Sequence, residues 1–260
     1  MPGIPVFIYH AIEDSAHPAG TRNPGEQLYV LSVSQFREQM EYLHREGYKT
    51  YLLEELQTLT EWPDKAVVLT FDDGHESNFT LALPILQEFS FKADFYITTG
   101  WIGTPCFMTE EQIKALSDAG MGIGSHGVTH TFLSDLPTVD ARKELDISRV
   151  ILTGILQRQI RSFSAPGGRI CSRVADLALA CGYTTICTSR PGLMTENEAF
   201  SDIPRFAVRA ADTFFNYTLI LRQDPQLLRS IAQRTSILKF AKIILGNYCY
   251  EKIRGILISG

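Results

Sequence analysis

The sequence lacks several features that would place the protein in a specialised class. Its five cysteines are an odd number and form no CxxC pair, which favours reduced thiols over a disulfide framework or a cysteine zinc site. No run of 18 uncharged apolar residues occurs, so no transmembrane helix is expected. The opening MPGIPVFIYH lacks a basic start followed by a long apolar run, so we predict no signal peptide and a cytoplasmic protein. The net charge of −5 gives no general attraction to nucleic acid.

The apolar content that is present is enough for a large core, because 45% of the 260 residues are hydrophobic. Short apolar runs alternate with helical patterns, which is typical of βα units and a mostly parallel sheet. This alternation predicts an α/β barrel, complete or incomplete, with its chemistry at the C-terminal ends of the strands. The predicted strands are Val6–Tyr9, Thr50–Leu53, Ala66–Phe71, Ala93–Thr98, Gly122–Ser125, Arg161–Ala165 and Thr184–Thr188. The predicted helices are Ser34–Glu46 with a serine cap, Ser77–Phe89 with a kink or late start at Pro84, Thr109–Ala119 with a capping box to Gln112, Thr138–Gln157 and Ser172–Cys181.

Residues 214–260 differ from the rest of the chain in charge. They hold seven lysines and arginines against Asp224 and Glu251, a local balance of +5. Apolar residues recur there at helical spacing from Leu227 to Leu245. We therefore predict a barrel domain over residues 1–213 and a helical extension over residues 214–260 that packs on the barrel. The alternative is that this basic segment contacts an anionic membrane or an acidic partner.

Two adjacent carboxylates stand at the end of a predicted buried strand. The apolar run Ala66–Leu69 leads into Thr70–Gly74, which has the sequence TFDDG. Two charges at such a place are costly unless something compensates them, and a divalent metal beside one would leave the other free as a base. The alternative is structural, with Asp72 and Asp73 capping the following helix, since aspartate favours helix starts.

Two histidines four residues apart follow another strand-like run. Ser125–His130 has the sequence SHGVTH and comes after Met121–Gly124. At this spacing His126 and His130 are expected on one face of a helical turn, where they can share a metal. Together with Asp73 they offer two imidazoles and a carboxylate, with positions left for water and substrate. The alternative is that both histidines are structural.

The two segments, in this order and context, resemble the first two motifs of the polysaccharide deacetylases, also called carbohydrate esterase family 4 or the NodB-homology group. The resemblance covers residues 4–210 and implies a distorted seven-stranded (β/α) barrel. It extends to the family's early Tyr-His strand, its first helix and the helix after its aspartates, which correspond here to Phe7–His10, Val33–Tyr48 and Asn78–Phe89.

The resemblance also implies a role for each of the four residues. Asp73, His126 and His130 would bind a divalent metal, and Asp72 would act as the general base. The chemistry agrees, because a metal lowers the pKa of bound water and polarises an amide carbonyl, while a nearby carboxylate takes the water proton. Two imidazoles and one carboxylate suit zinc but also accept cobalt, nickel, manganese or iron.

The chain departs from the family in its third motif, which commonly reads Arg-x-Pro-Tyr-Gly. Here Phe163–Arg169 reads FSAPGGR, with Ser164 at the place of the arginine and Gly167 at that of the tyrosine. In the family that arginine orients the catalytic aspartate, so Asp72 lacks an expected partner. Arg205 would replace it if its strand closes the barrel nearby, and the alternative is an ordinary surface salt bridge.

The general acid is the second departure. Family members often use a histidine from a late Leu-x-His motif, but the last histidine here is His130. His10, at the end of the first predicted strand, is the best replacement because it would face the same end of the barrel. His75, directly after Gly74, is an alternative. A structural role for either residue, or protonation by a metal-bound histidine, also stays open.

We therefore expect a hydrolase of carbon–nitrogen bonds that removes N-acetyl groups from N-acetylhexosamine units of a polysaccharide or glycoconjugate. Two alternatives stay open: a metal-dependent amidase or esterase for another acyl substrate, and a sugar-binding protein on the same scaffold without turnover. Four aromatic residues near strand ends, more often core than surface in such places, are candidates to stack on a sugar ring: Phe71, Tyr96, Trp101 and Phe107.

Overall fold

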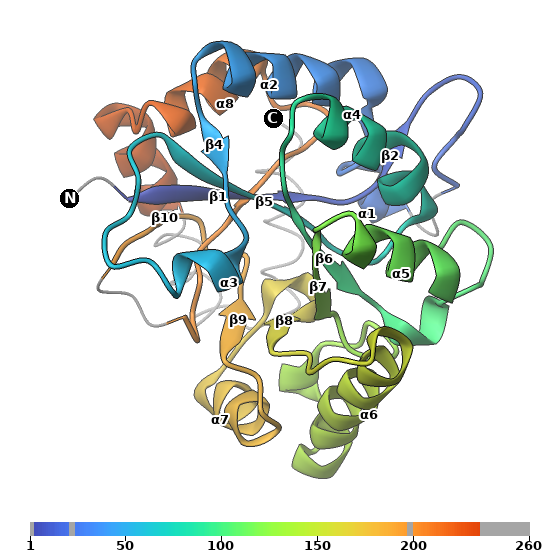
Figure 1. Cartoon of the computed structure of the whole chain (residues 1–260). Helices are drawn as coiled ribbons and strands as arrows, with labels where there is room; N and C mark the ends of the chain where they lie inside the picture. Colours follow the sequence, from blue (N-terminus) through green and yellow to red (C-terminus); the bar gives the residue numbers. More distant parts are fainter. Residues whose placement is uncertain (1–2, 21–23, 197–199, 235–260) are drawn as a thin grey trace.

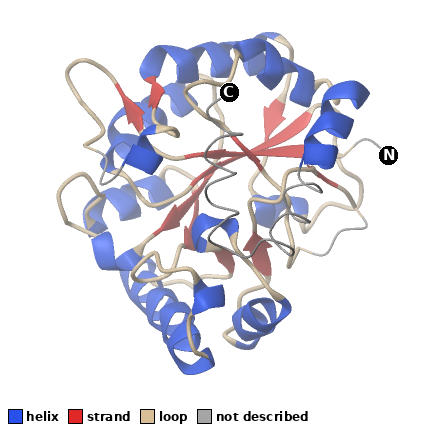
Figure 2. Cartoon of the chain, turned by 180° about the vertical axis from the view of Figure 1, so that it is seen from behind, coloured by secondary structure: helices blue, strands red, loops and turns tan. Residues whose placement is uncertain are grey.

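A curved, mostly parallel sheet forms the centre of the protein in the computed structural model, which describes residues 3–20, 24–196 and 200–234. Its strands are β1 (Ile4–Tyr9), β4 (Lys49–Thr50), β5 (Ala66–Phe71), β6 (Asp94–Ile97), β7 (Gly122–Ser125), β8 (Ser162–Ser164), β9 (Thr185–Cys187), β10 (Leu193–Met194) and β11 (Phe206–Ala207). They follow the order β10-β1-β5-β6-β7-β8-β9, with β4 beside β5, β11 beside β1, and β10 antiparallel. A separate pair joins β2 (Ile12–Glu13) to β3 (Leu31–Ser32). Figures 1 and 2 show helices around the outside of the sheet.

A short segment after β9 links the last strand of the sheet to the first. Cys187 at the end of β9 pairs with Ile203 in a parallel bridge, and β11 then pairs in parallel with β1. The N–H of Val208 donates to the carbonyl of Ile8 over 2.9 Å. Residues 203–208 therefore complete the ring of strands, which confirms the predicted distorted (β/α) barrel and places Arg205 inside it.

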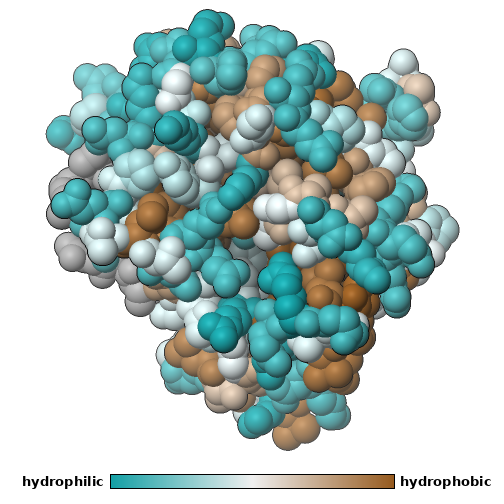
Figure 3. All heavy atoms as spheres, viewed as in Figure 1, coloured by the Kyte–Doolittle hydropathy of each residue, from teal (hydrophilic) through white to brown (hydrophobic). Residues whose placement is uncertain are grey.

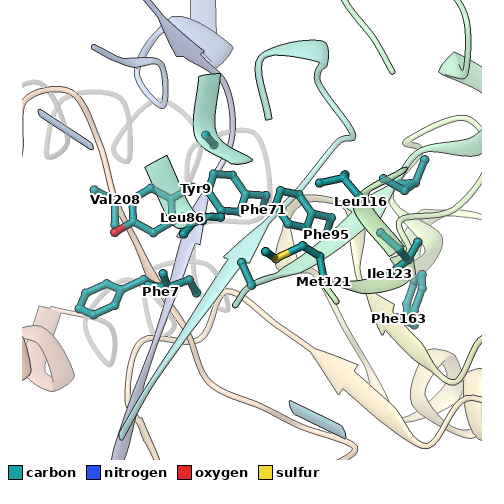
Figure 4. Close-up of a cluster of buried hydrophobic side chains, with 14 of the residues drawn as sticks. Phe7, Tyr9, Phe71, Leu86, Phe95, Leu116, Met121, Ile123, Phe163 and Val208 are labelled. Atoms are coloured by element: carbon teal, nitrogen blue, oxygen red, sulfur yellow. The ribbon is translucent and has the colours of Figure 1, made fainter. Parts of the chain in front are cut away.

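The two long strands are buried along their whole length, β1 as IPVFIY and β5 as AVVLTF. Both faces are covered because helices pack on the outside and side chains fill the barrel. Figure 4 shows the layer between sheet and helices, where the rings of Phe71 and Phe95 stack with centroids 4.8 Å apart. Successive strand residues point to opposite faces, so Val68 and Thr70 face the interior and Asp72 continues that row.

The helices are α1 (Pro24–Gln27), α2 (Val33–Arg45), α3 (Leu53–Leu56), α4 (Leu83–Glu88), α5 (Glu110–Asp118), α6 (Thr138–Leu156), α7 (Ser172–Ala180) and α8 (Phe214–Leu221). The five predicted helices correspond to α2, α4, α5, α6 and α7 and, apart from the late start of α4, begin and end close to the predicted positions. α8 lies in the predicted helical extension, and α1 and α3 were not predicted. The predicted irregularity near Pro84 is confirmed, because a π-helical stretch over Asn78–Ala82 precedes α4 and Pro84 lies in the first turn of α4.

One helix cap differs from the prediction. The N-cap of α2 is Ser32 and not Ser34, because the Ser32 hydroxyl accepts the Gln35 N–H over 3.2 Å while the Gln35 side chain accepts the Ser32 N–H over 3.0 Å. The capping box of α5 is present as predicted, with Thr109 accepting the N–H of Gln112 over 3.3 Å.

The short predicted strand Thr50–Leu53 is wrong beyond Thr50. Leu53 begins α3, because its N–H donates to Oδ2 of Asp94 over 3.0 Å and the preceding N–H, of Leu52, donates to Glu55 over 2.9 Å. Side-chain acceptors from Asp94 and Glu55 thus satisfy the first free N–H groups of the helix. The apolar residue Leu53 gives no sign in the sequence that a helix begins there.

The start of the predicted C-terminal extension packs on the barrel. α8 lies beside α2 in Figure 1, and the ring of Tyr217 lies 4.5 Å from that of Phe7, measured between centroids. Residues 235–260, with most of the predicted basic helix, lie outside the described residues. The division at residue 213 and the contact with a membrane or acidic partner therefore stay predictions. Within the described ranges, no helix is long and apolar enough to cross a membrane.

Candidate metal centre

The candidate site lies where several strands end on one side of the barrel. β1 and β5 run in register to their last residues, and so do β6 and β7. Because parallel strands end at the same edge, the residues directly after them, His10, Asp72 and His126, come together there. This is the C-terminal edge of the barrel, where the sequence predicted the chemistry.

Three side chains of metal-ligand type converge at this edge. The Nε2 atoms of His126 and His130 lie 3.3 and 3.2 Å from Oδ1 of Asp73, and one ligand atom of each residue falls within 4.8 Å of the others. Oδ1 of Asp73 is buried and accepts no hydrogen bond of good geometry, although two imidazoles lie beside it. A shared cation would satisfy this oxygen and both nitrogen lone pairs at once. The three residues therefore fit a divalent metal.

The main chain orients the first histidine. Nδ1 of His126 lies 2.8 Å from the carbonyl oxygen of Ser164, and because a carbonyl can only accept, Nδ1 carries the proton. Nε2 is then left with its lone pair on the side of Asp73, the orientation that a metal ligand needs. His130 is more exposed, and its ring lies against that of Trp101 with centroids 5.1 Å apart.

The two histidines do not lie on a helical turn, so this part of the prediction was wrong. Residues 126–131 form an irregular loop after β7, in which Gly127 has φ +79° and His130 has φ +61°. The loop is held by the short turn Thr99–Trp101 that follows β6, since the N–H of Gly100 donates to the carbonyl of Val128 over 2.9 Å. The left-handed residues turn the chain back on itself, and this turn brings the two imidazoles to a centroid distance of 5.1 Å.

The charges of the three residues depend on one another. Burial raises the pKa of Asp73, but the imidazoles of His126 and His130 outweigh it and hold that pKa well below its usual range. Burial lowers the pKa of His130, but the contact with Asp73 outweighs it and the net shift is upward. Asp73 is therefore ionised over the whole physiological pH range, as a metal ligand must be.

The second carboxylate, Asp72, is held by Arg205 inside the barrel. Nη1 and Nη2 of Arg205 donate to the two oxygens of Asp72, each over 2.9 Å. The remaining donors reach Oγ1 of Thr70 (2.9 Å), Oγ of Ser164 (2.7 Å) and the carbonyl of Thr188 (2.9 Å). All five N–H groups of the guanidinium are thus used. Arg205 is 1% exposed, so the alternative of a surface salt bridge was wrong.

This arrangement explains the unusual third motif. The Ser164 hydroxyl donates to Oδ2 of Asp72 over 3.0 Å and lies against Arg205, so a longer side chain at position 164 would occupy the space of the guanidinium. Burial raises the pKa of Asp72, but the charges of Arg205 and His126 outweigh it and hold the pKa below its usual value. Thr70 is a partner of Arg205 that the sequence motifs did not predict, although the period of two along β5 places it on the face of Asp72.

The two candidates for the general acid differ in their contacts. Nδ1 of His10 is buried without a hydrogen-bond partner among the described residues. Burial lowers the pKa of His10, and the nearby charges of Asp73 and Asp72 oppose this effect. Both ring nitrogens of His75 are engaged, Nδ1 with the Ser77 hydroxyl at 2.8 Å and Nε2 with the Ala19 carbonyl at 2.5 Å. The geometry therefore favours His10 over His75 as a residue free to exchange a proton.

The aromatic residues proposed to stack on a sugar divide into two groups. Phe71 and Tyr96 are fully buried, so they are core residues and the prediction was wrong for them, because both belong to strands covered on each face. Trp101 is partly exposed and contacts Phe107, with centroids 4.7 Å apart, as well as His130. Trp101 therefore remains the candidate at the edge of the site.

Comparison with known proteins agrees with this geometry. The profile of the family described as Polysaccharide deacetylase matches residues 60–186. YxkH of Bacillus subtilis, a protein named as a polysaccharide deacetylase, is 28% identical over 209 residues, which are 79% of this chain and 71% of that protein. The poly-beta-1,6-N-acetyl-D-glucosamine N-deacetylase of Escherichia coli K12 is 31% identical over 116 residues, but these cover only 16% of its length.

Solved structures show the same fold. The deacetylase PplD of Streptococcus pyogenes, determined in complex with acetate, superposes with a TM-score of 0.71 and 25% identity, covering 81% of this chain and 94% of that one. IcaB of Ammonifex degensii gives a TM-score of 0.73 at 22% identity, covering 85% and 96%. Fold and relatives together define an enzyme of the hydrolase class that acts on carbon–nitrogen bonds. In sequence and in fold the chain is similar to the polysaccharide deacetylases.

Proposed function

We propose that this protein removes N-acetyl groups from N-acetylglucosamine units of a polysaccharide, with a divalent metal held by Asp73, His126 and His130. The observation that carries the proposal is the pair of adjacent carboxylates with different surroundings. Asp73 has an unsatisfied oxygen beside two imidazoles, whereas Asp72 is fixed by Arg205. One carboxylate thus suits a metal ligand and the other a base.

The proposed chemistry is hydrolysis of the acetamide by water. A metal at this site would lower the pKa of bound water and polarise the acetamide carbonyl. Asp72 takes the proton from the attacking water, since its lowered pKa keeps it ionised. Its Oδ1 retains a lone pair beyond the one that accepts from Arg205, whereas Oδ2 accepts from both Arg205 and Ser164. The carbon–nitrogen bond then breaks, acetate leaves, and the departing amine takes up one proton, delivered through His10, to balance the proton that Asp72 took from the water. Arg205 and Ser164 hold the Asp72 carboxylate in one orientation.

The substrate class rests on the relatives. A protein named poly-beta-1,6-N-acetyl-D-glucosamine N-deacetylase matches 43% of this chain at 31% identity, which supports a β-1,6-linked N-acetylglucosamine polymer over a general glycoconjugate. Zinc suits two imidazoles and a carboxylate, and cobalt, nickel, manganese or iron are accepted by the same set. The cytoplasmic location stays a prediction.

Acetate release from N-acetylglucosamine oligomers tests the proposal. The protein is treated with a chelator, assayed, and assayed again after addition of zinc, cobalt or nickel, with His126→Ala as the control. We expect release that the metal restores in the wild-type chain and that the variant lacks. Stoichiometric metal without release from β-1,6-linked or other N-acetylated oligomers would refute the deacetylase activity, and failure to bind metal would refute the site itself.

The general base is tested separately. Asp72→Asn should keep the metal, because Asp72 is not among the three ligands, and should lower turnover by a factor of about 100 or more. Undiminished turnover of this variant would exclude Asp72 as the base.

A further inference from the structure

Glu144 lies on α6, outside both sequence motifs, yet it binds the loop that carries the two histidines. Its Oε2 accepts the N–H groups of Val128 over 2.7 Å and Thr129 over 3.0 Å. Its Oε1 accepts the hydroxyl of Thr129 over 2.8 Å. One carboxylate therefore bridges two consecutive backbone donors that stand between His126 and His130.

A second residue of α6 supports the same loop. Ser148, one helical turn after Glu144, places its Oγ 2.7 Å from that of Ser125, and Oγ of Ser125 accepts the N–H of Gly127 over 3.1 Å. Residues four apart on a helix face the same side, so Glu144 and Ser148 point together toward β7. The side chains of Ser125 and Glu144 thus satisfy the N–H groups of residues 127, 128 and 129. The opposite side of α6 is exposed and contributes hydrophobic side chains to the surface at the lower right of Figure 3.

The loop needs such support because its backbone is unfavourable on its own. His130 has φ +61°, and a non-glycine residue in the left-handed region costs about 1–3 kcal/mol, so it persists only where the surroundings impose it. Gly127, with φ +79°, has its missing Cβ position 3.1 Å from Oε2 of Glu144, so the carboxylate fits closely against the turn. A charged acceptor makes stronger hydrogen bonds than a neutral one, and Glu144 supplies it directly before His130.

We propose that Glu144 is a positioning residue that holds the Ser125–His130 loop in its metal-binding shape before a metal arrives. The inference rests on the proposed function, because it takes Asp73, His126 and His130 as the metal ligands. A loop that is already ordered loses little further entropy when the metal binds. Removing the support therefore weakens metal binding, by the factor of about 10–100 that partners of ligating residues typically contribute.

Three variants separate this role from a general effect on the helix. Glu144→Ala removes both acceptor oxygens, and Glu144→Gln keeps the shape and one acceptor oxygen. Asp140→Ala is the matched control, because Asp140 is an exposed carboxylate on the same helix, paired with Lys143 over 2.9 Å and away from the loop. For each protein we would measure the zinc dissociation constant by competition with a chelating dye. Amide hydrogen exchange at residues 128 and 129 would be followed in the metal-free protein.

The expected result is a zinc dissociation constant raised about 10–100-fold in Glu144→Ala, with faster exchange at the two amides. Glu144→Gln should recover most of the affinity, and Asp140→Ala should match the wild type in both measurements. A Glu144→Ala protein that binds zinc as tightly as the wild type would overturn the positioning role and leave the proposed function standing. An equal loss in Asp140→Ala would also overturn it. A wild-type chain without zinc affinity would instead overturn the proposed site, and the inference with it.

A shorter carboxylate keeps the test decisive if Glu144→Ala does not fold. Glu144→Asp retains the charge but is one methylene too short to bridge Val128 and Thr129 in their present positions. It should weaken zinc binding in the same direction, and unchanged affinity of this variant would overturn the inference.

Discussion

Replacing Arg205 by Met tests how strongly the barrel depends on one buried ion pair. The Arg205 side chain is 0% exposed and that of Asp72 is 6% exposed, so the substitution leaves an ionised carboxylate where water barely reaches it. Removing one partner of such a pair costs about 3–5 kcal/mol. We expect the free energy of unfolding of Arg205→Met at neutral pH to be lower than that of the wild type by about this amount.

The loss should depend on pH in a defined direction. In the wild type the folded pKa of Asp72 is below its unfolded value of about 3.9, so its stabilising contribution is present above that value and is lost as pH falls through the folded pKa. In the variant, burial acts without Arg205 to oppose it, so the folded pKa of Asp72 should rise above the unfolded one. Protonation of Asp72 then removes the buried charge from the variant. The difference in the free energy of unfolding between the two proteins should therefore shrink as the pH approaches about 4.

Urea unfolding of the metal-free proteins, from about pH 7 down to about pH 4.5, measures this difference. Arg37→Met is the control, because Arg37 pairs with Glu88 at the surface over 2.9 Å with 38% and 51% of the side chains exposed. An exposed pair of this kind contributes no more than about 1 kcal/mol. The reasoning is refuted if Arg205→Met loses no more stability than Arg37→Met, or if its loss is the same at every pH.

Three further substitutions probe other groups. Asp73→Ala should remove bound metal and activity together, because a ligand is lost, and metal analysis showing full zinc content would contradict this. His10→Gln should lower turnover about 100-fold while zinc content stays the same, and an unchanged rate would assign the proton donor elsewhere. Burial raises the pKa of Asp94 to about 7, above its unfolded value of about 4. The free energy of unfolding therefore falls by about 1.4 kcal/mol for each pH unit between about 4 and 7, because the unfolded chain loses this proton more readily. Asp94→Asn keeps an acceptor for the Leu53 N–H and removes this cost. In thermal melts the variant should therefore gain stability over the wild type above pH 7 and gain little near pH 4, and a pH-independent difference would contradict the assignment.

Much of the fold follows from local sequence. The predicted strands Ala66–Phe71 and Gly122–Ser125 have the same bounds as β5 and β7. For β5 the reason is that a strand buried on both faces leaves a continuous hydrophobic signal. The Thr109 capping box fixed the start of α5 for an equally local reason. Where the acceptor came from a distant residue, as Asp94 does for Leu53, the local signal failed and a helix start was taken for a strand.

The candidate site also has features that the local sequence predicts and features that depend on distant residues. The sequence by itself determined the chemical groups and their place at strand ends, since the order of strands and turns delivers Asp72, Asp73 and His126 to one edge of the barrel. It gave the wrong local shape for the histidine pair, because positive φ angles at His130 are imposed by contacts outside the motif.

Only the tertiary structure decided which partners these groups have. Arg205 reaches Asp72 because the segment after β9 crosses to β1 and closes the ring of strands, a pairing between residues far apart in the chain. Glu144 reaches the histidine loop because α6 packs along β7. The chemical type of each side chain is known from the sequence. A buried charge, however, is stable only beside a partner, and the way the whole barrel closes decides which residue that partner is.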